Sequence, residues 1–285
     1  MKDIPVIHVR GKTIAEGYEK SIYAVFKNGI DIKTQYDKPE DPPSKDCTLN
    51  LVIDEPFTDP MIHKCFPGDL SNLREYIYEL EGYKNNWVKD ISDSKDTRWE
   101  YLYSSRMTNW GRYKENNQWS GFFNINQVES VIEKLKKQPY TRQAQIITWY
   151  PPHDLNVYDP ACLQSLHFRI IENTLNVNIR FRSNDAYNAF MFNCFGLVQF
   201  IKRNIIDKID KNLIFGRLNW QADSFHIYGK DINNCKKLLI DKIDNGLPFD
   251  KRVMNFYDPI VQEMYTECEQ SILDKIKQTE EGFKN

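Results

Sequence analysis

The stretch Leu175–Asn193, LNVNIRFRSNDAYNAFMFN, changes its pattern halfway along. Its first part alternates between apolar residues and asparagines or arginines as far as Arg182. This period of two predicts a β-strand with one apolar face and one basic, polar face. The residues that follow are mostly apolar without alternation, and they predict a largely buried helix over Ala186–Asn204. A strand whose polar end, R-S-N-D, leads directly into a helix is therefore expected.

The flanking segments continue this mixture of strands and helices. Apolar or alternating runs predict strands at Leu49–Ile53, Ala144–Trp149, Leu166–Ile171 and Leu213–Tyr228. Apolar residues at helical spacing predict helices at Thr13–Lys27, Ser71–Val88, Asn126–Lys137 and Pro259–Thr279. Three prolines in Asp37–Lys45, DKPEDPPSK, predict a loop. Strands and helices do not alternate regularly, which indicates an α+β fold with a mixed β-sheet flanked by helices.

Composition narrows the class of protein. The chain has 285 residues, with 38 Lys+Arg against 40 Asp+Glu and a formal net charge of −2. This length fits one large domain or two small ones. The near-neutral charge argues against a nucleic-acid-binding protein, which is usually basic. The most apolar segment, Asn188–Ile201, is too short to span a membrane, and no secretion signal precedes the fold, so we expect a cytoplasmic protein.

The chain contains six cysteines, and none of them shows the spacing of a zinc site. A reducing cytoplasm keeps such thiols free. Cys162 follows the run Asp159-Pro160-Ala161 and directly precedes a predicted strand. Arg182 and Ser183 end the next strand. Guanidinium groups suit a phosphate dianion, and the same positive field lowers the pKa of a nearby thiol, so Cys162 is a candidate nucleophile.

These residues resemble the thymidylate synthase signature, in which an R-S-x-D strand end leads to an asparagine on the next helix. Cys162 precedes Asp185 by 23 residues and Asn193 by 31, which is similar to the spacing of that family's nucleophile. Arg142 lies 20 residues before Cys162, again as in the family. The order and the gaps together make the resemblance specific.

Three further segments resemble the family in the same order. Leu73–Gly82, LREYIYELEG, is similar to the helix E-L-L-x-x-L-x-G and places Glu75 at the catalytic glutamate. The segment LYSSRMTNW, with Tyr103, is similar to Y-G-x-x-x-x-x-W. Ser224–Tyr228, SFHIY, is similar to D-x-H-x-Y. The resemblance runs from about residue 70 to residue 230.

The resemblance implies a single catalytic domain over residues 1–285 that forms a sheet-to-sheet homodimer. It implies transfer of a one-carbon unit from 5,10-methylenetetrahydrofolate to C5 of a pyrimidine nucleoside 5′-monophosphate. In this reaction Cys162 adds to C6 of the base, Glu75 relays protons, and Tyr103 helps to remove the C5 proton.

The resemblance also implies how the substrates are held. Arg182 and Ser183 bind the 5′-phosphate together with Arg142, which reaches over from the second subunit. Asn193 reads the edge of the base. His226 and Tyr228 contact the sugar 3′-hydroxyl. Asp185 contacts the folate pterin.

The chain departs from the family pattern at several of these positions. Ala161-Cys162-Leu163 replaces Pro-Cys-His, Gln143 replaces a second arginine, and Ser224 replaces an aspartate. The arginine of the N-terminal phosphate loop has no counterpart. The small apolar C-terminus that closes over the folate is replaced by Glu280–Asn285, EEGFKN. These departures resemble those of the hydroxymethylases that act on CMP or dCMP, a divergent branch.

The product and the base depend on two features. A polar C-terminus excludes water poorly, which favours a hydroxymethyl product formed with water over a methyl product formed by hydride transfer. An asparagine at position 193 is typical of thymidylate synthases, but its amide can pair with cytosine as well as uracil. We therefore expect hydroxymethylation of CMP or dCMP, with methylation of dUMP as the alternative. A non-catalytic nucleotide-binding paralogue is the third interpretation.

Overall fold

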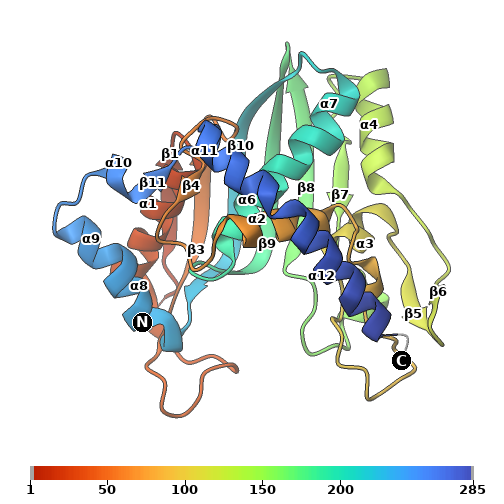
Figure 1. Cartoon of the computed structure of the whole chain (residues 1–285), viewed down its shortest axis with the longest axis horizontal. Helices are drawn as coiled ribbons and strands as arrows, with labels where there is room; N and C mark the ends of the chain where they lie inside the picture. The colour runs from red at the N-terminus through yellow and green to blue at the C-terminus, as the bar shows by residue number, and fades with distance from the viewer. Residues whose placement is uncertain (1–2, 284–285) are drawn as a thin grey trace.

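The computed structural model describes residues 3–283, which fold around one mixed sheet (Figure 1). The strand order is β1-β3-β10-β9-β8-β7, and β2 also pairs with β3. Strand β1 runs parallel to β3, and β10 runs parallel to β9. The other neighbouring strands of this sheet are antiparallel. The strands are β1 Val6–Gly11, β2 Ile30–Ile32, β3 Ser44–Ile53, β7 Gln145–Ile147, β8 Leu163–Ile171, β9 Thr174–Asp185 and β10 Ile214–Ile227. The predicted α+β fold with a mixed sheet is confirmed.

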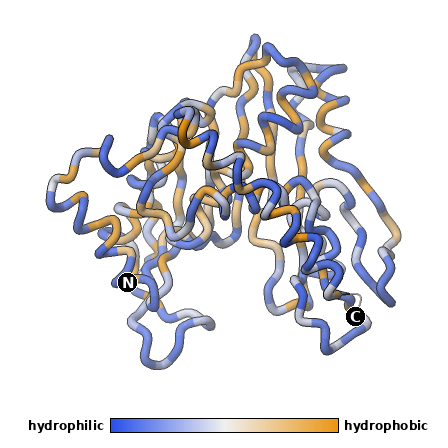
Figure 2. Tube along the Cα trace, viewed as in Figure 1, coloured by the Kyte–Doolittle hydropathy of each residue, from blue (hydrophilic) through white to orange (hydrophobic). Residues whose placement is uncertain are grey.

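The main helices bury the apolar face of this sheet. They are α1 Ile14–Asn28, α2 Leu70–Leu80, α3 Tyr103–Thr108, α4 Gln127–Lys137, α6 Phe190–Ile201, α11 Pro259–Glu267 and α12 Glu269–Gly282. Figure 1 shows α2, α6, α11 and α12 on one side of the sheet. Helix α6 is apolar around most of its surface and lies in the core, packed against α2. In Figure 2, hydrophobic residues follow the central strands, and the peripheral loops are hydrophilic.

Shorter elements join these parts. They are β4 Ile62–His63, η1 Asn85–Trp87, β5 Tyr113–Glu115, β6 Gln118–Ser120, α5 Pro151–Asp154, η2 Lys202–Ile206, α7 Asp207–Ile209, η3 Gly229–Asp231, α8 Ile232–Cys235, η4 Lys236–Ile240, α9 Asp241–Asp244, α10 Phe249–Arg252 and β11 Val253–Met254. Strand β4 pairs with β11, and β5 pairs with β6. Within residues 3–283, no helix combines the length and the apolar character needed to cross a membrane.

Three predicted helix boundaries were wrong. Helix α2 ends at Leu80, not at residue 88, because Gly82 takes a left-handed φ of 92° and turns the chain. The predicted helix at 259–279 is two helices, α11 and α12, which meet at Cys268. Helix α6 begins at Phe190, since Asp185 accepts hydrogen bonds from the backbone N–H groups of Tyr187 and Asn188 and holds a turn there.

The second face of the sheet is polar. Along β9 the buried residues alternate with Asn176, Asn178 and Arg180, as the sequence predicted. Arg180 donates to Asp223 on β10 at 2.9 Å, and their side chains are 55% and 38% exposed. The pair therefore lies on an open surface of β9 and β10, opposite the buried side chains of the same strands.

Candidate active site

Cys162 lies in the loop that enters β8, and two neighbouring elements fix its backbone. Its N–H donates to the Tyr101 hydroxyl at 3.3 Å, and the next N–H, of Leu163, donates to the Tyr103 hydroxyl at 3.1 Å. The Cys162 carbonyl accepts from the N–H of Arg182 on β9 at 2.9 Å. The start of α3 and the polar end of β9 thus meet at the cysteine, as the sequence predicted for Tyr103 and Arg182.

The electrostatic balance at Cys162 differs from the expectation. Burial raises the pKa of the Cys162 thiol, and the opposing charge of Arg182 does not outweigh it. The Arg182 guanidinium donates to the carbonyls of Ala161 and Pro160, at 3.1 and 2.5 Å, and lies 3.9 Å from the Asp159 carboxylate. Arg182 therefore holds the cysteine loop in this structure, while remaining partly exposed to an anion from solvent.

Asn193 lies on α6 with its side chain oriented by α2. The Tyr76 hydroxyl donates to Asn193 Oδ1 at 2.6 Å, and Asn193 is buried. Desolvation raises the pKa of Tyr76, and the charges of Tyr103, Glu79 and Cys162 add to this effect. Asn193 therefore lies in the same buried neighbourhood as Cys162, with its amide oxygen bound by a phenol.

His226 is supported by a carboxylate from a different strand. The Ser224 hydroxyl donates to Asp46 Oδ2 on β3 at 2.9 Å and lies 3.2 Å from His226 Nδ1. Asp46 and His226 are direct neighbours in the β3–β10 ladder. His226 Nε2 is buried and has no hydrogen-bond partner among the described residues. With Nδ1–H donating to Ser224, Nε2 is a hydrogen-bond acceptor without a partner.

Tyr228 packs beside His226, with ring centroids 4.5 Å apart. Its ring centroid also lies 6.1 Å from that of Tyr36, the residue just before the predicted loop. Burial raises the pKa of Tyr228, and the charges of Asp185 and Cys162 are among the further causes. The Tyr228 ring thus lies between His226 and Tyr36, and the role of the His226–Tyr228 pair in holding the sugar stays a prediction.

Glu75, the expected proton relay, lies on α2 and is bound by two lysines. Its carboxylate binds Lys84 Nζ at 2.8 Å and Lys275 Nζ, from α12, at 2.9 Å. Burial opposes ionisation of Glu75, but the hydrogen bonds from Lys84 and Lys275 outweigh it and lower its pKa. The assignment of Glu75 as a proton relay stays a prediction, because its carboxylate is bound by two ammonium groups.

A cavity of about 460 Å³ opens beside the tyrosines that hold the cysteine loop. Its lining is Glu79, Arg98, Trp99, Glu100, Tyr101, Leu102, Tyr103 and Asp159. Sequence analysis singled out only Tyr103 from this set as a site residue. Glu79 lies one helical turn after Glu75, so the helix period was the available signal.

Three other predicted site residues, Arg142, Asp185 and Ser183, make contacts outside the cysteine loop. Arg142 is exposed before β7, where its carbonyl lies 3.0 Å from His167 Nε2 in the middle of β8. Asp185 accepts three hydrogen bonds from Tyr187 and Asn188. Ser183 is next to Arg182 at the end of β9 and pairs in register with Ser224. Of these three, Ser183 directly follows Arg182, whose backbone N–H binds the Cys162 carbonyl.

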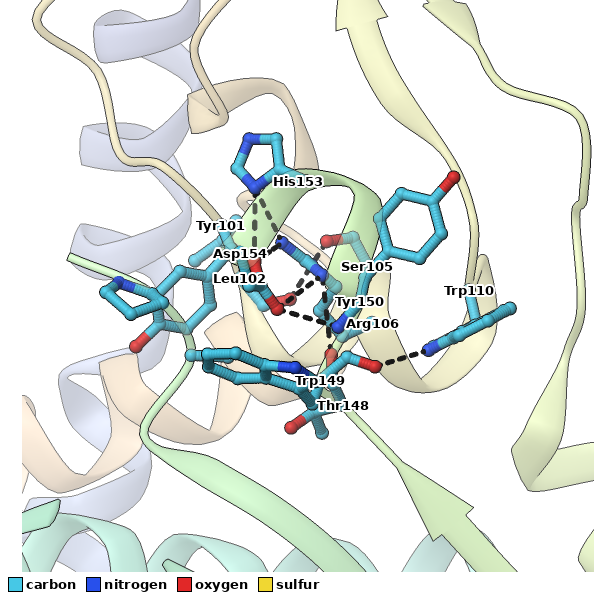
Figure 3. Close-up of polar contacts among 12 residues, drawn as sticks. Tyr101, Leu102, Ser105, Arg106, Trp110, Thr148, Trp149, Tyr150, His153 and Asp154 are labelled. Atoms are coloured by element: carbon cyan, nitrogen blue, oxygen red, sulfur yellow. Dashed lines mark hydrogen bonds and ion pairs between the residues drawn. The ribbon is translucent and has the colours of Figure 1, made fainter. Parts of the chain in front are cut away.

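A buried ion pair anchors α3 beneath the site (Figure 3). Arg106 of α3 binds both carboxylate oxygens of Asp154 in α5, at 2.6 and 3.1 Å. The ring of His153 lies 3.2 Å from the guanidinium, and the Tyr150 N–H donates to the carboxylate at 2.7 Å. Because Tyr103 begins α3, this pair fixes the helix that carries it.

We expect Asp154→Asn to lower the free energy of unfolding by about 3–5 kcal/mol, because it leaves the buried Arg106 guanidinium without a counter-charge. Urea unfolding followed by circular dichroism measures the loss. The matched control is Asp241→Asn, in the exposed pair with Lys236, where a change of at most about 1 kcal/mol is expected. Equal effects of the two substitutions would contradict the anchoring role of Arg106–Asp154.

Within residues 3–283, no cluster of three or more His, Cys, Asp or Glu side chains is arranged to hold a metal ion. The six cysteines are free thiols. Cys162 and Cys268 are half-buried, and the other four are buried.

The amino-acid sequence is similar to those of known proteins. A family model described as thymidylate synthase matches residues 70–263. A protein of Methanosarcina barkeri named "Putative thymidylate synthase" is 27% identical over 232 residues, covering 81% of this chain and 94% of the relative. A protein of the same name from Methanocaldococcus jannaschii is 28% identical over 239 residues, covering 80% and 94%. The thymidylate synthase of Enterobacteria phage T4 is 26% identical over 145 residues, covering 48% and 50%.

The family match spans both α2 and the whole region from the cysteine loop to His226. It therefore covers Cys162, Arg182, Asn193 and the cavity beside α3. The chain belongs to the thymidylate synthase family.

Proposed function

We propose that the chain is a folate-dependent one-carbon transferase that hydroxymethylates C5 of CMP or dCMP. The observation that carries the proposal is the meeting of Cys162, Arg182 and Tyr103 at one loop, held by three backbone hydrogen bonds. A nucleophile, an anion-binding group and a phenol at one place match the needs of covalent addition to a nucleotide base. The family relationship supports the same reaction class.

The residues present fit the nucleotide. Arg182 and Ser183 stand at the strand end where a 5′-phosphate can replace the loop carbonyls as the partner of the guanidinium. Asn193, with Oδ1 bound by Tyr76, presents its amide NH₂ to an acceptor on the base, either N3 of cytosine or O4 of uracil. The unpartnered Nε2 of His226 accepts the sugar 3′-hydroxyl, beside Tyr228.

The cavity beside α3 fits the folate cofactor, 5,10-methylenetetrahydrofolate. Its volume of about 460 Å³ and its aromatic wall of Trp99, Tyr101 and Tyr103 suit a flat bicyclic ring. When bound, the cofactor supplies the methylene group at the oxidation level of formaldehyde. Asp185 remains a prediction as its pterin contact, since its carboxylate already accepts three hydrogen bonds.

The protein groups act on the base in a fixed order. The Cys162 thiolate forms a bond to C6, and the C5–C6 π electrons move to C5, which takes up the one-carbon group. Tyr103 removes the C5 proton, which would let tetrahydrofolate leave the one-carbon group, and water would add to that carbon as the S–C6 bond breaks and returns the thiolate. Overall, nucleotide, methylenetetrahydrofolate and water give the 5-hydroxymethyl nucleotide and tetrahydrofolate, without net oxidation or reduction.

The placement of α12 supports water as the final reactant. Glu269, at its start, accepts from the Tyr78 hydroxyl at 2.5 Å, and Lys275 binds Glu75, so α12 is fixed along α2. An apolar tail free to close over a cofactor would exclude water; a charged helix bound along α2 does so less well. Residues 284 and 285 of the polar C-terminal segment lie outside the described residues.

Methylation of dUMP is the second candidate. It is favoured by Asn193, which is the residue that thymidylate synthases carry, and by the names of the relatives. A non-catalytic nucleotide binder is the third. Cys162, Tyr103 and Tyr76 are half-buried side chains whose pKa values are raised by burial, and their proximity argues for a catalyst, because binding alone needs no nucleophile.

We further propose that two chains associate through the polar face of the sheet. Arg180 is exposed on β9, and Arg142 is exposed in the segment before β7. Arg142 does not reach the cysteine loop of its own chain. A two-fold dimer lets each Arg142 complete the phosphate site of its partner. We also propose that residues 1–285 act as one domain, supported by one continuous core, in the cytoplasm, where free thiols persist.

The experiment that tests the function incubates the protein with methylenetetrahydrofolate and, separately, CMP, dCMP, UMP and dUMP. Mass spectrometry weighs each nucleotide product while absorbance follows dihydrofolate. We expect a hydroxymethyl product on a cytosine nucleotide without dihydrofolate. A methyl product on dUMP with dihydrofolate supports the second candidate, and nucleotide binding without any product supports the third.

A further inference from the structure

Helix α2 carries two carboxylates, Glu75 and Glu79, that have different surroundings. Tyr76 and Glu79 are three residues apart, so they lie on one face of the helix. Tyr76 reaches Asn193, and Glu79 lines the cavity with Tyr103. Glu79 is therefore on the side of α2 that faces the site.

Glu75 precedes Glu79 by one turn and is occupied by cations. Lys84 binds Glu75 at 2.8 Å and lies 3.6 Å from Glu79. Lys275 adds a second ammonium to Glu75 and not to Glu79. The side chain of Lys84 is only 4% exposed, so its positive charge is little screened by water. Glu75, the nearer carboxylate, is stabilised most by this charge.

The consequence is an unequal pair of acids. Two carboxylates that share one buried ammonium do not both ionise readily, and the one with better partners holds the charge. Glu75, with two lysines, is the charged member. Glu79 is the member that holds a proton, and it holds that proton at the wall of the cavity.

We propose that Glu79, rather than Glu75, is the carboxyl group that exchanges a proton with the pyrimidine ring. The inference rests on the proposed function. When the Cys162 thiolate bonds to C6, electrons move through C5 and C4 onto N3 of cytosine, or onto O4 in the case of uracil, and that atom takes the proton of Glu79. When the S–C6 bond breaks, the electrons return and the proton goes back to the Glu79 carboxylate. No oxidant or reductant takes part.

The surroundings of Glu79 suit this cycle. Burial raises the pKa of Glu79 to about 7, against the attraction of Lys84, and the charge of Glu75 raises it further. The other titratable groups around the same cavity are Arg98, Glu100, Tyr101, Tyr103 and Asp159. An acid with a pKa near the working pH both donates and accepts a proton efficiently.

The test measures release of tritium from C5 of labelled nucleotide by the full-length protein. We expect Glu79→Gln to slow release about 10²- to 10⁴-fold at pH 7, the usual contribution of a positioned acid–base group. Nucleotide affinity, measured by calorimetry, is expected to change little. The matched control is Glu263→Gln, on the exposed side of α11, which is expected to release tritium at the wild-type rate.

The pH profile separates a catalytic from a structural role. Since the protonated form of Glu79 is the donor, the wild-type rate is expected to fall as pH rises above about 7, and Glu79→Gln is expected to lack this fall. Glu75→Gln frees Lys84 for Glu79. It is therefore expected to stabilise the ionised Glu79 and to move the fall to lower pH, while keeping most of the turnover at its own optimum.

Two results overturn the assignment. Wild-type release by Glu79→Gln together with loss in Glu75→Gln assigns the proton to Glu75 and leaves the proposed function in place. Release that does not depend on Cys162, or no release from any of the four nucleotides, removes the proposed function and this assignment with it.

Discussion

Cys162→Ser is expected to lower C5 tritium release and product formation by about 10⁴-fold or more, the scale of loss when a covalent nucleophile is removed. A serine hydroxyl ionises far less readily than a thiol, and nothing at this loop compensates. Burial already raises the pKa of the Cys162 thiol, with only Arg182 acting strongly against it. The backbone bonds to Tyr101 and Tyr103 do not involve the sulfur, so the loop is expected to stay in place.

Calorimetric titration with nucleotide is the companion measurement, and binding within a few-fold of wild type is expected. Cys268→Ser is the matched control, because Cys268 is the other half-buried thiol and lies at the junction of α11 and α12. It is expected to remain active. An active Cys162→Ser variant would contradict covalent catalysis, and binding by a wild-type protein that never releases tritium would identify a nucleotide-binding paralogue.

Mixing Arg142→Ala, an impaired variant, with Cys162→Ser, an inactive one, is expected to restore activity. Arg142→Ala removes a charge-assisted phosphate contact worth about 1.5–3 kcal/mol, or roughly 10- to 100-fold in rate at subsaturating nucleotide. If Arg142 serves the partner's site, a mixed dimer with Cys162→Ser has one intact site and one site lacking both groups. With random exchange at equal amounts, about a quarter of wild-type activity is expected, since half the dimers are mixed and each has one working site.

Unmixed samples of each variant, taken through the same exchange procedure, are the controls. Activity is expected to peak near equal amounts and to fall, at either extreme, to that of the unmixed variant. Sedimentation shows whether dimers form. A strictly monomeric, active protein, or dimers that exchange subunits without recovery, would refute the assignment of Arg142 to a shared site.

The central sheet could be predicted because its information is local. The alternation in β9 and the long run of β10 each report a strand within a dozen residues, and both are present. The end of α2 was missed because Gly82 is a single residue inside an otherwise helical pattern. The separation of α11 from α12 was missed for a similar reason, since apolar residues continue across Cys268.

The candidate site was likewise predictable only where it depends on local sequence. Residues fixed by strand ends, such as Cys162 and Arg182, were found from order and spacing. The environment of Glu79 was not found, because it depends on where Lys84 and Lys275 come to lie. Lys275 is 200 residues from Glu75 in sequence. The carboxylate that supports His226 likewise comes from Asp46, on a strand far from Ser224 in the chain.

The alternation of β9 also limits how this protein can change over evolutionary time. From 174 to 181 its even- and odd-numbered positions face, respectively, the open surface and the core, and Arg182 and Ser183 follow shortly before the strand ends at Asp185. Substitutions at one position can be accommodated locally. Loss of a single codon within 174–181 would exchange the two sets of side chains or pull the terminal arginine away from Cys162, because strand side chains repeat every two residues. Length variation among descendants of this gene should therefore collect in the loops and be absent from β9.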